Sequence, residues 1–150
     1  MTRTVPIIRA FGVLLLAQFA ATVPGSAQTP VHLTVQVIHA SNAGSAVDPA
    51  LAKIRSQLRS MKYSSYTLLE TRPFSTTVGG KHAVPLPGGK TLDLYPYGLS
   101  GGSLELMVTI TDGSKRLLDT TFRLANGATI LVGGPAHADG VLIVAISGSF

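Results

Sequence analysis

Hydrophobic and polar residues alternate along much of the chain after residue 30. In the segment 31–40 every second residue from Val31 to Val37 is apolar, and the residues between them are polar. The segment 103–111 repeats the pattern, with Leu, Leu, Val and Ile between polar residues or Met. A period of two is that of a β-strand with one buried and one exposed face.

Glycine pairs and Asn-Gly or Asp-Gly pairs separate these segments, and such pairs favour tight hairpins because they tolerate positive φ. The strands expected between the turns are 31–40, 63–71, 74–78, 82–86, 91–95, 103–111, 115–124, 128–132 and 141–147. The apolar runs 130–132 and 141–146 do not alternate. Both are therefore predicted to be central strands, buried on two faces.

One segment has the period of a helix instead. Apolar residues recur in steps of four and three at positions 47, 51, 54, 58 and 61. Asp48 is a suitable N-cap, and Pro49 suits the first helical position. We expect one amphipathic helix over about 49–62, packed across a sheet or between two sheets. The predicted fold class is α+β, mainly antiparallel β, as a sandwich-like sheet of hairpins with one amphipathic helix.

The first 27 residues have the layout of a cleavable secretory signal peptide. Arg3 and Arg9 precede or flank an apolar run over 10–23, and the small residues Gly25 and Ala27 suit signal peptidase. The run is shorter than the roughly 20 residues that span a bilayer. We therefore expect cleavage after Ala27, no transmembrane helix afterwards, and a single mostly-β domain over 28–150.

The net charge and the absence of cysteine exclude several classes of partner and site. Loss of Arg3 and Arg9 lowers the net charge from +5 to about +3, which weakens the case for a nucleic-acid partner. The chain has no cysteine, so neither disulfides nor thiolate metal sites contribute. Export and the missing disulfides together favour the bacterial periplasm or cell envelope, or an extracellular location.

No motif for catalysis fits its context. The run 98–102 matches the G-x-S-x-G pattern around Ser100, but a strand is expected after it where a nucleophile elbow needs a helix. The sequence indicates no catalytic residue, no cofactor and no metal site. His32 and His39 are separated by an odd number of residues on one strand, so they point to opposite faces. His137 and Asp139 are the one local pair that could supply two metal ligands.

Basic residues gather on one flank of the predicted helix. Arg55, Arg59 and Lys62 lie within a narrow arc beside the apolar stripe, and no acidic residue occurs between Asp48 and Glu70. Such a strip could contact an anionic surface or an acidic partner, or it could be a solvated helix flank. These three residues are the candidate binding site.

The sequence thus favours a non-catalytic binding or interaction module of the bacterial envelope, acting on a protein partner or an anionic surface. One alternative is a small enzyme, for which Ser100, His137 and Asp139 are the residues to test. Another is a small outer-membrane β-barrel, because Phe150 ends an apolar strand as in proteins of that class.

Overall fold

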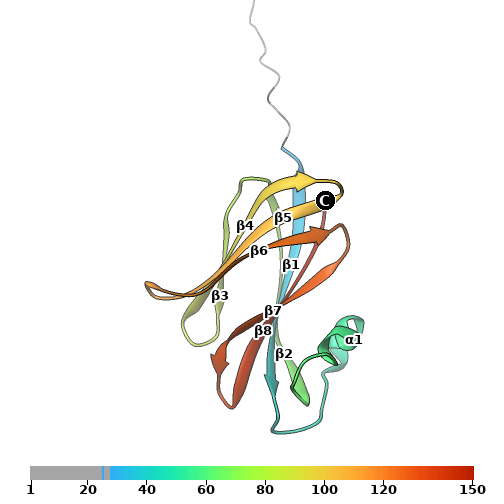
Figure 1. Ribbon diagram of the computed structural model, residues 1–150, viewed down its shortest axis with the longest axis vertical. Helices are drawn as coiled ribbons and strands as arrows, with labels where there is room; N and C mark the ends of the chain where they lie inside the picture. The colour runs from blue at the N-terminus through green and yellow to red at the C-terminus, as the bar shows by residue number, and fades with distance from the viewer. Residues whose placement is uncertain (1–24, 26–27) are drawn as a thin grey trace, which may run out of the picture.

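The computed structural model describes Gly25 and residues 28–150, so the predicted signal peptide, apart from Gly25, lies outside the described residues. Eight strands and one short helical segment make up the described part (Figure 1). The strands are β1 Pro30–Ser41, β2 Ser65–Thr77, β3 His82–Leu86, β4 Lys90–Ser100, β5 Ser103–Asp112, β6 Lys115–Ala125, β7 Thr129–His137 and β8 Gly140–Ser149. Every strand pair is antiparallel. The predicted class, α+β and mainly antiparallel β, is confirmed.

The strands form two four-stranded sheets. Sheet A has the order β2-β1-β8-β7, and sheet B has the order β3-β4-β5-β6. The apolar faces of the two sheets enclose one buried cluster, to which Leu33 of β1, Leu106 of β5 and Val144 of β8 belong. This cluster is the core that the alternating pattern predicts.

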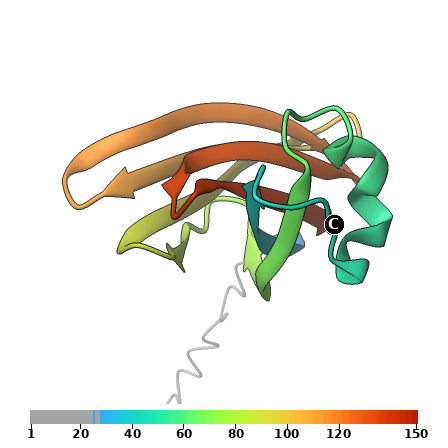
Figure 2. The same cartoon turned by 90° about the horizontal axis from the view of Figure 1, so that it is seen from below.

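The helical segment covers the other face of sheet A. It consists of a 3₁₀ turn over Pro49–Ile54 followed by the α-helix α1 over Arg55–Leu58. Leu51, Ile54 and Leu58 pack with Ile38 of β1 and Ile143 of β8 in a second buried cluster. In Figure 2 the helix lies beside sheet A, at the side of the molecule opposite the tip of the β5–β6 hairpin.

The helical segment begins at Pro49, as the sequence predicts, but it ends at Leu58 and not at residue 62. The Asp48 carboxylate accepts a hydrogen bond from the N–H of Ala50, as an N-cap does. At the other end, the Ser60 hydroxyl donates to the carbonyl of Gln57 and the Tyr66 hydroxyl donates to the carbonyl of Leu58. The N–H groups of Ser60 and Met61 also donate to these two carbonyls, in the tighter i→i+3 pattern, so the α-helix ends there with its last carbonyls satisfied.

Several sequence predictions differ from the structure in the strands. The expected strand 91–95 extends to Ser100 in β4, and the expected strand 128–132 continues through Gly133 and Gly134 to His137 in β7. The expected strands 63–71 and 74–78 are one strand, β2, because Pro73 lies on a sheet edge, where a missing N–H is tolerated. The prediction that the run 130–132 is a central strand is wrong, because the run belongs to β7, which is an edge strand of sheet A. The run 141–146 is central as predicted, with Leu142 to Ile146 all buried.

No helix in the described part of the chain is long and apolar enough to cross a membrane.

The start of β8 requires a glycine. A side-chain carbon at Gly140 would overlap the carbonyl oxygen of Ala40 on β1, whereas one at Gly133 on the edge strand β7 would meet nothing within 4 Å. We therefore expect Gly140→Ala to lower the free energy of unfolding by about 2–3 kcal/mol, and Gly133→Ala to change it by less than about 0.5 kcal/mol. Urea unfolding of both variants measures the difference; equal effects would contradict the close approach of β8 to β1.

Candidate functional site

The outer face of sheet B carries an open concave surface. The alternation that buries Leu94 of β4 and Val108 of β5 points their neighbours in sequence outward. The strand register then sets outward residues side by side in rows across the sheet. One row holds Asp93, Thr109 and Asp119, from β4, β5 and β6 respectively.

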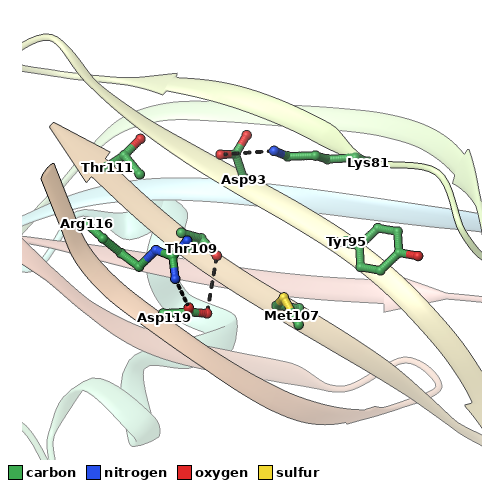
Figure 3. A pocket seen from close by; sticks show the side chains of 8 residues that line it. All are labelled: Lys81, Asp93, Tyr95, Met107, Thr109, Thr111, Arg116 and Asp119. Atoms are coloured by element: carbon green, nitrogen blue, oxygen red, sulfur yellow. Dashed lines mark hydrogen bonds and ion pairs between the residues drawn. The ribbon is translucent and has the colours of Figure 1, made fainter. Parts of the chain in front are cut away.

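These rows border an open groove of about 610 Å³ (Figure 3). Its lining residues are Lys81, Asp93, Tyr95, Met107, Thr109, Thr111, Arg116 and Asp119. We call this surface the sheet-B groove. All but Lys81, which precedes β3, lie on β4, β5 and β6, so a stable part of the fold sets its shape.

Ion pairs stand on both sides of the groove. The Lys81 ammonium lies 3.6 Å from the Asp93 carboxylate, and the Arg116 guanidinium lies 2.7 Å from the Asp119 carboxylate. Thr109 Oγ1 approaches Asp119 within 3.5 Å. Each carboxylate in the groove therefore has a basic partner. Such surface ion pairs leave no unpaired carboxylate that could act as a general acid or base.

Exposed apolar side chains lie along the same face. Tyr95 and Met107 are directly opposite each other on β4 and β5, and they are 36% and 40% exposed. Tyr97, which is 42% exposed, stacks beside Tyr95 with ring centroids 6.4 Å apart and 22° between the ring planes. Glu105 and Arg123, 3.1 Å apart, continue the face beyond the groove on β5 and β6.

The residues predicted as a binding site lie elsewhere, beside the helix. Arg55 and Arg59 line a small pocket of about 240 Å³ together with Tyr63, Ser64 and Tyr66. Lys62 is exposed and is not among the residues that line it. Within the described residues, no ion pair joins any of the three basic side chains to an acid.

Tyr66 of β2 lines this pocket and bonds the helix to sheet A. Its hydroxyl donates a hydrogen bond of 2.9 Å to the Leu58 carbonyl, and the residue is 4% exposed. Burial raises the pKa of Tyr66 above its ordinary value of 10.0. Its ionised form is disfavoured in the folded state because that form would lose both water and the hydrogen bond it now donates.

The residues considered for catalysis do not meet. Ser100 ends β4, whereas a side-chain carbon at Gly88, just before β4, would lie 4.0 Å from His137. A strand of this length spans about 30 Å, so Ser100 and His137 are at opposite ends of the sandwich.

The structure does bring a different group together. His39 Nε2 is buried 3.2 Å from the Asp139 carboxylate, and the His39 and His137 rings contact edge to face at 5.7 Å. Sequence spacing alone could not place His39 beside the β7–β8 turn. Among the described residues, no group of three or more His, Asp or Glu side chains is arranged to hold a metal ion.

Comparison with known proteins adds no assignment. No family model, curated protein or solved structure matches this chain. The function of the protein is therefore inferred from the sheet-B groove and the pocket beside the helix.

The raised pKa of Tyr66 predicts a pH dependence. Stability that depends on its neutral hydroxyl is fully present below pH 10 and is lost as pH rises through the higher pKa of the folded state. Tyr66→Phe should cost about 1 kcal/mol at pH 7 through the lost hydrogen bond, and should remove this alkaline loss. Urea unfolding between pH 8 and 11.5 measures both effects. Tyr97→Phe is the control, and an alkaline loss that persists in Tyr66→Phe would contradict the assignment.

Proposed function

We propose that this protein is an exported, non-catalytic binding module of the bacterial periplasm or cell envelope. Its N-terminal sequence supports export, since residues 1–27 have the layout of a cleavable signal peptide. We further propose that it binds a protein partner through the outer face of sheet B.

The observation that carries this proposal is the composition of that face. Tyr95, Tyr97 and Met107 are exposed together, and Arg116 and Arg123 border them on β6. Tyr, Met and Arg are enriched in the centres of protein interfaces. The rim that surrounds such a centre is usually polar. Tyr95, Tyr97 and Met107 lie on β4 and β5, the two central strands of sheet B, so little conformational entropy is lost when a partner covers them.

The groove also suits binding better than turnover. Asp93 and Asp119 are its carboxylates, and both are held by basic side chains at 3.6 and 2.7 Å. An acid catalyst must instead present a proton to its substrate. The remaining polar groups at its centre are the hydroxyls of Thr109 and Thr111, which suit hydrogen bonds at an interface.

Truncating the apolar centre should release the partner. We expect Tyr95→Ala combined with Met107→Ala to reduce recovery of a stoichiometric partner at least about tenfold, because central aromatic side chains in interfaces cost roughly 2 kcal/mol or more when removed. The measurement is affinity capture by the tagged protein from its own envelope fraction, with mass spectrometry.

Leu69→Ala is the matched control, since Leu69 is an equally exposed apolar residue, at 44%, on β2 of sheet A. Capture that is unchanged in the double variant, or lost equally in Leu69→Ala, would reject sheet B as the binding face. Absence of any stoichiometric partner would reject the stable-partner proposal itself.

The basic strip beside the helix supports a second contact, with an anionic surface. Arg55 and Arg59 have no acidic partner within the described residues and open into the same pocket. A basic side chain near an anionic membrane contributes about 1 kcal/mol. We therefore expect Arg55→Glu with Arg59→Glu to weaken sedimentation with phosphatidylglycerol vesicles at least about tenfold at low salt.

Lys53→Glu is the control for that experiment, because Lys53 is exposed on the same segment and does not line the pocket. Equal loss with Lys53→Glu would mean that net charge alone governs binding. Unchanged sedimentation of the double variant would reject the proposal that Arg55 and Arg59 bind an anionic surface.

A further inference from the structure

The four edge strands of the two sheets are not equally protected against pairing with another strand. An edge strand exposes unpaired N–H and C=O groups, and natural proteins obstruct such edges with proline, bulges, short strands or covering segments. The edges here are β2 and β7 of sheet A and β3 and β6 of sheet B.

Three of these edges are obstructed by proline. Pro73 lies in β2, Pro85 in the five-residue strand β3, and Pro135 in β7. A register shift further disrupts β2 near Leu69 and β7 beside Pro135. The segment before the helix also covers the start of β2, because the Tyr66 backbone bonds to residues 46 and 48.

β6 has none of these obstructions over most of its length. It contains no proline, and its pairing with β5 is regular over the eight residues from Leu118 to Ala125 after one shift near Leu117. The β5–β6 hairpin also extends beyond the rest of the sandwich (Figure 1). The outer edge of β6 is therefore open to an added strand.

The core is also left incomplete on this side. Leu118 and Phe122 of β6 face inward and pack on the core, yet both are only partly buried. At the opposite side of the sandwich, the rings of Phe74 and His82 stack 3.8 Å apart and join β2 to β3. A strand added to β6 would cover the apolar side chains that β6 leaves accessible.

The sequence of β6 is complementary to itself in one antiparallel register. Two copies related by a twofold axis through Thr121 would set Asp119 of each opposite Arg123 of the other on the outer face. On the inner face Leu118 would lie opposite Leu124 of the second copy. Registers centred on Asp119 or on Arg123 would instead place like charges directly opposite, which is unfavourable.

We propose that two copies of this chain associate through β6, so that two B sheets join into one continuous eight-stranded sheet. The proposal does not depend on the proposed function, since it concerns the strand edge and not the apolar centre of the face. It would double the outer face offered to a partner.

Cysteine cross-linking tests the register directly. The chain has no cysteine of its own, so Thr121→Cys introduces a single thiol. Residues at the twofold centre have Cβ atoms about 4.5–5.5 Å apart, close enough for oxidation to join the two copies with small adjustments. We expect the protein purified after expression of the full chain to sediment as a dimer, and the Thr121→Cys variant to be converted largely to a covalent dimer.

Thr71→Cys, an exposed threonine on the edge strand β2, is the matched control and should remain uncross-linked. A monomer at all concentrations up to about 0.5 mM would overturn the proposal, as would equal cross-linking at Thr71 and Thr121.

A charge exchange provides the second test. Arg123→Asp should raise the dimer dissociation constant about tenfold, because two opposite-charge pairs become like-charge pairs. Asp119→Arg added to Arg123→Asp restores complementarity and should restore dimerisation. If the double variant is as monomeric as Arg123→Asp while thermal unfolding shows both to be folded, the register is wrong.

Discussion

The structure depends on the burial of β8 on both of its faces, together with the half of β1 after Val37 that pairs with it. Sheet B covers one face of this pair and the helical segment covers the other. β8 is apolar without alternation from Leu142 to Ile146, so neither face tolerates water. Two layers are therefore required beside sheet A, and the short helix is retained for the surface it covers rather than for its own helical stability. Sheet B has only one such layer, and side chains such as Tyr95 and Met107 on its outer face are exposed.

Local pattern was enough to predict most of the fold. Alternation predicted β1 and β5, and the steps from Leu51 to Leu58 predicted the buried face of the helical segment. Glycine pairs predicted hairpin turns correctly except at Gly133-Gly134, which lies within β7. Two errors came from information that is not local. The run 130–132 is as apolar as a central strand, but its place at the sheet edge follows from strand order. In the sequence Pro73 indicates a strand break. On an edge strand, however, the missing proline N–H leaves no ladder hydrogen bond unmade.

The candidate site was harder to predict for the same reason. Tyr95 and Met107 lie on different strands, and only the register of β4 against β5 makes them neighbours. The arginine partners of Glu105 and Asp119 likewise follow from strand pairing and side-chain placement, which the sequence does not show. Helical spacing is short-range, and the structure does place Arg55 and Arg59 on one small pocket, although it leaves Lys62 outside that pocket.

Partner binding and self-association through β6 are both proposed for sheet B, and amide hydrogen exchange reports on its strands separately. The most direct measurement is amide hydrogen exchange followed by mass spectrometry, on the protein alone and on the protein captured with its envelope partner. Binding through sheet B predicts added protection in peptides from β4, β5 and β6 when the partner is bound, and unchanged exchange in β2 and β7. Protection confined to sheet A or to the helical segment would contradict the assignment of sheet B as the binding face.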